Sequence, residues 1–216
     1  PRNDIKRPKF NILPRERLRK MNVLRRIAKL YRKIKRSCCF EKTIIFRRQC
    51  GICTKVDSKE AAPSIEHMIY NNSSELSNED LINLEVIISK EGAKNVLRQV
   101  NRANYRMFAI KLNGELAHFC LVVTCKKGGF FGLAHEGDIM ITGCNTIEKH
   151  RRKGLYKANL DHICSNWHSS KQAYINTRPV NIISQKGLQA AGFERMGTYS
   201  FFRIGRLTAR VRKCGN

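Results

Sequence analysis

Three consecutive cations followed by a glycine form the stretch of the sequence with the clearest chemical potential. Arg151, Arg152 and Lys153 precede Gly154, directly after an apolar run from Ile139 to Ile147, and a segment with helical spacing follows. A strand that leads through such a turn into a helix presents unpaired backbone N–H groups at the helix start, where the macrodipole favours an anion. Glycine permits close approach of the backbone, and the cations can donate to phosphate oxygens. The stretch therefore predicts a pyrophosphate-binding loop.

Two common nucleotide-binding patterns are absent from the chain. Neither G-x-x-x-x-G-K-[ST] nor G-x-G-x-x-G after a strand occurs in the sequence. The predicted ligand is therefore not a nucleotide held in either of these ways. From the motif alone, a solvated basic turn remains an equal alternative.

Two motifs resemble the signature of the GNAT superfamily of acyl-CoA-dependent N-acyltransferases. Arg151-x-x-Gly154-x-Tyr156 resembles its coenzyme A pyrophosphate loop, Arg/Gln-x-x-Gly-x-Gly/Ala, and Asn181-x-x-Ser184 followed by Gly192-Phe193 is similar to the second half of the signature. The resemblance runs from about residue 81 to residue 204. Within the superfamily, Cys144-x-Thr146 and the residues around it resemble a branch associated with bacterial cell-envelope polysaccharide clusters.

The resemblance implies a mixed α/β (α+β) fold with a central, mostly antiparallel twisted sheet, splayed parallel central strands and flanking helices. It implies acetyl-CoA as co-substrate, with the pyrophosphate on the loop and the pantetheine along the end of the strand before it. The residues that it assigns to this cofactor are Cys144, Asn145, Thr146, Arg151, Arg152, Lys153, Gly154, Leu155, Tyr156, Asn181 and Ser184.

The candidate acid and base depart from the family pattern. The superfamily often has a tyrosine four residues after the small residue of Asn-x-x-Ala/Ser, and Leu188 stands there. The polysaccharide-associated branch has an acid just before Cys-x-Thr, where this chain has Gly143. The remaining candidates for a base are Asp138 and Glu136, with His135 and His118 as further ones. We assign the catalytic role to Asp138 and Glu136, although an acid at a strand end also commonly caps a turn.

Composition predicts one core with a basic extension. The chain has 216 residues, 42 Lys and Arg against 17 Asp and Glu, and a formal charge of +25. Residues 1–55 hold nineteen of the basic and three of the acidic residues. We expect a basic extension over residues 1–41 and an acetyltransferase-like domain over residues 42–216. Such charge favours nucleic acid, anionic lipid or phosphorylated substrates as partners.

Within the extension, residues 15–36 have apolar side chains at helical spacing among many Lys and Arg, which predicts a basic amphipathic helix. Three interpretations stay open: a helix docked on the domain, which is favoured, an interfacial helix on anionic lipid, and a nucleic-acid grip, which is the least favoured.

The nine cysteines lack the dense, regular spacing of a small disulfide-rich secreted domain and favour a reducing cytoplasm. A zinc site at Cys38-Cys39 and Cys50-x-x-Cys53 is a weak alternative, because adjacent cysteines chelate poorly, so we predict no metal. No apolar run suits a signal peptide or a membrane span. The predicted location is cytoplasmic, with peripheral contact to the inner face of the membrane left open.

Several further elements follow from local patterns. Asn113-Gly114 between the apolar runs Met107–Leu112 and Leu116–Cys125 predicts a hairpin with a type I′ turn. Ser77-x-x-Asp80 predicts a capped helix start. Short strands are expected at 43–48, 65–70 and 173–176, and a helix is expected over 155–168.

Three functions compete. The first is an acetyl-CoA-dependent N-acetyltransferase for a primary amine of a small acceptor, such as a nucleotide-linked amino sugar. The second is a catalytically silent acyl-CoA-binding module, because the expected tyrosine and acid are missing. The third is a nucleic-acid-binding protein driven by charge. A homodimer is also left open.

Overall fold

The computed structural model describes residues 38–51, 65–168, 170–204 and 207–214. Its contacts divide the chain into two units, residues 42–200 with 210–216, and residues 1–41 with 201–209. The larger unit holds the described helices and most of each described strand. The described residues of the smaller unit belong to the ends of three strands. The predicted amphipathic helix lies outside the described residues, and the predicted boundary between residues 41 and 42 stays a prediction.

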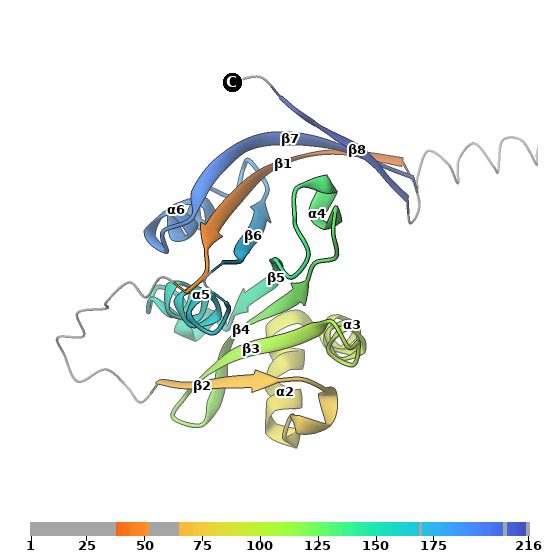
Figure 1. Ribbon diagram of the computed structural model, residues 1–216. Helices are drawn as coiled ribbons and strands as arrows, with labels where there is room; N and C mark the ends of the chain where they lie inside the picture. Colours follow the sequence, from red (N-terminus) through yellow and green to blue (C-terminus); the bar gives the residue numbers. More distant parts are fainter. Residues whose placement is uncertain (1–37, 52–64, 169, 205–206, 215–216) are drawn as a thin grey trace, which may run out of the picture. The chain divides into compact units, whose positions relative to one another are not determined.

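Eight strands form one sheet in the order β2-β3-β4-β5-β6-β1-β7-β8 (Figure 1). Neighbouring strands from β2 to β5 are antiparallel, β5 and β6 are parallel, and β6 and β1 are antiparallel. The mixed, mostly antiparallel sheet with a parallel central pair is therefore confirmed. The strands are β1 Cys38–Gln49, β2 Ile65–Tyr70, β3 Tyr105–Leu112, β4 Glu115–Thr124, β5 Ile139–Thr146, β6 Gln172–Thr177, β7 Glu194–Ile204 and β8 Leu207–Lys213.

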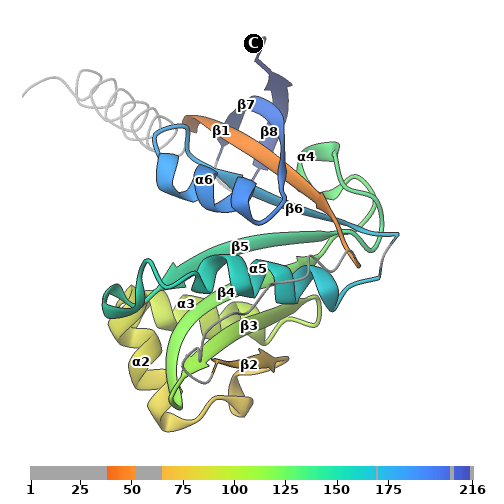
Figure 2. The same ribbon diagram turned by 90° about the vertical axis from the view of Figure 1, so that its left-hand side faces the viewer.

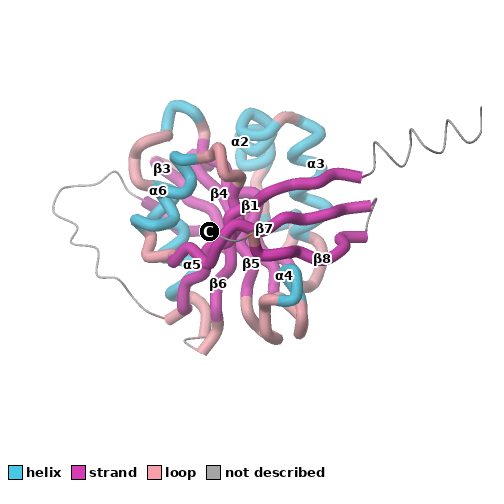
Figure 3. The backbone as a smooth tube through the Cα atoms, turned by 90° about the horizontal axis from the view of Figure 1, so that it is seen from above, coloured by secondary structure: helices cyan, strands magenta, loops and turns pink. Residues whose placement is uncertain are grey.

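Helices cover both faces of the half-sheet β2–β5, which explains the long apolar runs of β3 and β4. On β3, Phe108 faces the cluster that includes α5, whereas its neighbours Met107 and Ala109 face the cluster of α2 and α3. Figure 3 shows α2 and α3 apart from α5 and α6. The helices are α2 Asn78–Ile88, α3 Lys90–Val100, α4 Gly129–Gly132, α5 Leu155–Ser165 and α6 Ile182–Ala190, with short 3-10 turns η1 Ser73–Glu75 and η2 Glu148–His150.

Local signals place several of these elements. Asn113 and Gly114 have φ of 52° and 81°, as the predicted type I′ turn requires. The capping box at the start of α2 is present, because Ser77 Oγ accepts from the Asp80 N–H at 3.1 Å and Asp80 accepts from the Ser77 N–H at 3.2 Å. The predicted end of α5 at residue 168 is wrong. The helix ends at Ser165, where the Asn166 side chain donates to the His162 carbonyl at 2.8 Å.

The parallel strands β5 and β6 are paired at one end only. Their pairing runs from Ile139–Ala173 to Ile141–Ile175. Beyond this point β5 continues to Thr146 and β6 to Thr177, and Figure 2 shows the two strands diverging. We call residues 142–146 and 176–177 the diverging end. From the diverging end, the polypeptide continues after β5 toward α5 and after β6 toward α6.

Candidate functional site

The basic loop, residues 151–154, links the diverging end of β5 to α5. Gly154 is the N-cap of α5 in the left-handed conformation, with φ of 73° and no side-chain cap. A Cβ built on it meets no heavy atom within 4 Å. The first N–H groups of α5 are therefore presented beside open space, as an anion site at a helix start requires.

The cations of the loop are exposed, whereas the residues before them are anchored. Glu115 of β4 binds Lys149 at 2.7 Å and His150 at 3.5 Å, and Lys149 holds the pKa of Glu115 below its usual value. Arg151 makes only a 3.6 Å contact with Glu148, and its side chain is 63% exposed. Arg152 and Lys153 are also exposed. The structure thus brings together the loop residues that the sequence predicted. The contacts of Glu115 hold the residues just before the loop against β4.

A β-bulge shapes the diverging end of β5. Opposite β4, Phe119 pairs with Asn145 and Leu121 with Thr142, so that Cys120 alone faces Gly143 and Cys144. Gly143 has φ of 60°, a conformation that suits the extra residue of a bulge. On the other side, the described part of β6 offers no strand partner to residues 142–146. Among the predicted residues Cys144 to Thr146, the N–H groups that point to this edge therefore have no strand partner in the described part of β6.

His118 lies under this bulge with both ring nitrogens engaged. Its Nδ1 is 2.7 Å from Thr146 Oγ1, and its Nε2 is 3.3 Å from Cys120 Sγ. The ring also meets the Tyr156 ring edge-on, at 5.9 Å between centroids. Burial lowers the pKa of His118 to about 4, so the imidazole is neutral at pH 7.

This burial predicts a loss of stability in acid. The unfolded chain binds a proton on His118 near pH 6.5, but the folded chain binds it only near pH 4. The stabilisation is therefore complete above pH 6.5 and is lost as the pH falls toward 4, by up to about 3 kcal/mol. His67 and His162 act in the same direction, because burial lowers the pKa of both. Urea titrations from pH 7 to pH 4 measure this slope.

One variant separates His118 from the other histidines. His118→Gln should remove part of the slope and leave the part that belongs to His67 and His162. Equal slopes in His118→Gln and the wild type contradict the assignment.

Tyr156 and Ser184 connect the two helices of the site. The Tyr156 hydroxyl is 3.5 Å from Ser184 Oγ, and burial raises the pKa of Tyr156, so the phenol stays protonated. Close approach needs Gly187, because a Cβ there would lie 2.9 Å from the Tyr156 ring. Asn181 is the N-cap of α6 and accepts from the Ser184 N–H at 3.1 Å. The predicted Asn181, Ser184 and Tyr156 thus lie in one network, and Asn181 also has the structural role of a cap.

The structure does not bring Asp138 and Glu136 to the basic loop. Both precede β5, whose far end lies roughly 25 Å along the strand. The two oxygens of Asp138 accept from the backbone N–H groups of His135 at 2.7 Å and Gln172 at 2.9 Å. Asp138 therefore clamps the start of β5 to β6, while Glu136 is exposed. Their catalytic role stays a prediction.

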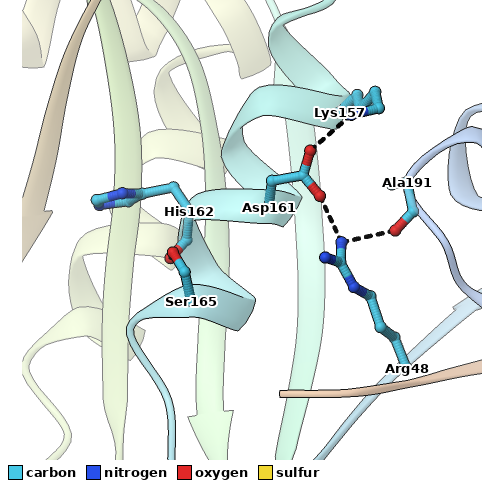
Figure 4. A network of polar contacts seen from close by, with 6 residues as sticks. All are labelled: Arg48, Lys157, Asp161, His162, Ser165 and Ala191. Carbon is cyan, nitrogen blue, oxygen red and sulfur yellow. Dashed lines mark hydrogen bonds and ion pairs between the residues drawn. The ribbon is translucent and has the colours of Figure 1, made fainter. Parts of the chain in front are cut away.

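Arg48 of β1 joins the two helices of the site, a contact that sequence reasoning missed. Its guanidinium donates to Asp161 of α5 at 2.5 Å and to the carbonyl of Ala191, the C-cap of α6, at 2.6 Å (Figure 4). Lys157 binds the second oxygen of Asp161 at 2.7 Å. Arg48 is 6% exposed. An arginine after an apolar run indicates a strand end, and no local pattern signals that it is buried between helices.

No protein-family model and no curated protein matches the sequence. Among solved structures, a functionally unknown conserved protein from Staphylococcus epidermidis aligns with a TM-score of 0.53 at 9% identity, over 82% of this chain and 66% of that one. A GNAT-family acetyltransferase from Colwellia psychrerythraea aligns with a TM-score of 0.49 at 11% identity, over 78% and 57% of the two chains. An aminoglycoside N-acetyltransferase in complex with coenzyme A gives 0.45 at 19% identity, over 70% and 100%.

These similarities concern the fold alone. The chain spans 57% and 66% of the lengths of the Colwellia and Staphylococcus proteins. The alignment with the Staphylococcus protein, the one of these three with a TM-score above 0.5, supports a mixed α/β fold and assigns no activity. Within the described ranges, no helix is long and apolar enough to cross a bilayer, and no three His, Cys, Asp or Glu side chains come together as metal ligands would.

Proposed function

We propose that the chain is an acetyl-CoA-dependent N-acetyltransferase that acetylates a primary amine of a small acceptor. One observation carries the proposal: β5 and β6 part after Ile141–Ile175 at the same end at which the basic loop opens α5. This arrangement combines unpaired backbone donors along β5 with an anion site at the helix start. An acyl-CoA molecule needs both, for its amides and its pyrophosphate.

The residues present fit such a co-substrate. Arg151, Arg152 and Lys153 are exposed around the α5 N-terminus, where they can bind the pyrophosphate together with the N–H groups after Gly154. Those N–H groups of residues 144–146 that point away from β4 can hold the pantetheine amides and the thioester oxygen. A donor aimed at charge that develops on this oxygen contributes a few kcal/mol to catalysis.

Tyr156 is our candidate proton donor for the leaving thiolate. The position at which the family resemblance implies a tyrosine holds Leu188, which is fully buried. Tyr156 instead brings a protonated phenol to within 3.5 Å of Ser184. We expect Tyr156→Phe to lower kcat by about 10²-fold, in the range for general acid catalysis, with little change in the KM for acetyl-CoA. Steady-state kinetics at saturating acceptor test this, and a change confined to KM contradicts it.

Asn181 provides a second kinetic prediction. Asn181→Ala removes the cap of α6, at a cost of about 1 kcal/mol in stability. If the amide also binds the co-substrate, the KM for acetyl-CoA rises as well. Ser77→Ala is the matched control, because it removes the cap of α2 without touching the site. If both variants lose stability alike and neither changes KM, Asn181 serves only as a cap.

The central experiment measures thiol release from acetyl-CoA with a panel of amines that includes polyamines, peptides, aminoglycosides and nucleotide-linked amino sugars. The last group is our first choice of acceptor, from the sequence motif around Cys144 and from the basic charge. Amine-dependent release supports the enzyme. A rise in melting temperature with coenzyme A but no release with any amine supports the second candidate, a silent acyl-CoA-binding module. This candidate is favoured by the buried Leu188 at the expected tyrosine position and by Gly143 at the expected acid position.

The excess of cations also leads to a proposal about location. With a formal charge of +25, the chain can bind the anionic inner face of the membrane from the cytoplasm, since each Lys or Arg near such a surface contributes about 1 kcal/mol. Binding to vesicles with phosphatidylserine should weaken steeply with salt. Protein that lacks residues 1–41 should lose most of its binding to these vesicles. Equal binding by full-length and deleted protein contradicts a role for the extension. Binding to nucleic acid and a homodimer stay predictions.

A further inference from the structure

Two cysteines meet at the bulge between β4 and β5. Cys120 of β4 and Cys144 of β5 have their sulfur atoms 2.8 Å apart, and both are free thiols. A disulfide needs about 2 Å between the sulfurs. The antiparallel pairing on either side of the bulge fixes the two backbones, so that bond formation requires a sulfur movement of less than about 1 Å.

The two thiols differ in access. Cys120 is fully buried, whereas Cys144 is partly exposed at the diverging end. A small molecule can therefore reach Cys144 and not Cys120. His118 Nε2 lies 3.3 Å from Cys120 Sγ, and both side chains are buried. In the tautomer that keeps its proton on Nδ1, facing Thr146 Oγ1, the neutral imidazole can accept a hydrogen bond from the Cys120 thiol.

We propose that Cys120 and Cys144 form an oxidisable dithiol, in which hydrogen peroxide attacks at Cys144 and Cys120 closes a disulfide across the bulge. In the first step, the Cys144 sulfur displaces water from the peroxide and becomes a sulfenic acid. In the second, the Cys120 sulfur attacks Cys144, and its proton passes to the sulfenic oxygen, which leaves as a second water. The two thiols lose two electrons to one peroxide.

A second pair of cysteines provides an internal comparison. Cys50 and Cys164 share a hydrogen bond between their side chains, but both are fully buried. Cys125 is also buried, so an oxidant has little access to its sulfur. Proximity alone therefore does not distinguish the Cys120–Cys144 pair. It is distinguished by one partner that an oxidant can reach.

The experiment uses the folded full-length chain, treated with hydrogen peroxide, alkylated and then digested with trypsin. Cleavage at lysine separates residues 112–126, with Cys120 and Cys125, from residues 128–149, with Cys144. We expect these two peptides as one linked species, lighter by two hydrogen atoms than their sum and separated by a reductant. Cys125→Ser should keep the link and Cys120→Ser should abolish it.

Cys120→Ser also isolates the first step. Without the second thiol, the sulfenic acid should persist on Cys144 and be captured by a cyclic 1,3-diketone such as dimedone. Cys144→Ser, at a partly exposed position, should abolish both the link and the capture while the fold is kept. A link between Cys50 and Cys164 instead, or no link in folded wild-type protein, overturns the proposal.

Discussion

Replacing Gly154 with valine is expected to abolish coenzyme A binding with little loss of folding stability. Gly154 has φ of 73°, and a Cβ there meets nothing within 4 Å. The fold therefore has room for a valine side chain, but valine disfavours this backbone conformation. A non-glycine residue in the left-handed region costs about 1–2 kcal/mol, and a β-branched one is worse. The loop relieves this strain by changing φ, which turns the first N–H groups of α5 away from the ligand.

Gly128 provides a matched control for this prediction. It has the same φ of 73°, it also has open space around its Cβ, and it begins α4 between β4 and β5, at the end of the sheet away from the basic loop. Gly128→Val should match the stability change of Gly154→Val and bind coenzyme A normally. Arg151→Ala should weaken binding by about 1.5–3 kcal/mol. Calorimetry measures all three affinities, and wild-type values for both Gly154→Val and Arg151→Ala exclude the basic loop as the site.

Replacing Arg48 with methionine is expected to cost about 3 kcal/mol of unfolding free energy. The change removes the hydrogen bonds that Arg48 donates to the Ala191 carbonyl and to one oxygen of Asp161. Removal of one partner from a buried ion pair costs about 3–5 kcal/mol. The lower end applies because Lys157 still binds Asp161. For a chain of this size, the melting temperature should fall by roughly 6–12 °C.

The neighbouring Arg47 is the control for Arg48. It lies on the same strand, its side chain is 43% exposed, and it contacts Glu194 at 3.8 Å. Arg47→Met should cost less than about 1 kcal/mol. In Arg48→Met with Asp161→Asn, a neutral amide replaces the carboxylate that loses Arg48, so the double variant should regain part of the lost stability. Urea unfolding compares all four proteins, and equal effects of Arg47→Met and Arg48→Met contradict a special role for the buried pair.

Local patterns predicted those parts of the fold that local contacts determine. The Asn113-Gly114 turn, the Ser77 cap and β2 at residues 65–70 were predicted with the bounds that the structure has. The basic loop was also predicted, because a strand, a glycine and a helix follow one another directly in the sequence. The short link makes their arrangement in space almost independent of the rest of the chain.

Contacts between distant segments could not be predicted in this way. The sequence predicted a strand at residues 43–48. No local pattern indicates that β1 lies between β6 and β7, or that the Arg48 side chain contacts Asp161. The same limit applies to Asp138, whose partner Gln172 is 34 residues away. Cys120 received no role for a related reason. Its partner faces it only because the bulge at Gly143 shifts the register of β5.

The place of β1 in the sheet has a consequence for the order of folding. Thr43 donates to the carbonyl of Thr177, 134 residues later, and β6 supplies the edge against which β1 pairs. During synthesis at about 5–20 residues per second, β1 waits roughly 7–27 seconds for that edge. Over this time Ile44, Ile45 and Phe46, fully or nearly buried in the finished sheet, are exposed to other chains. Arg47 and Arg48 follow them directly, and cations at this position oppose aggregation of the waiting strand.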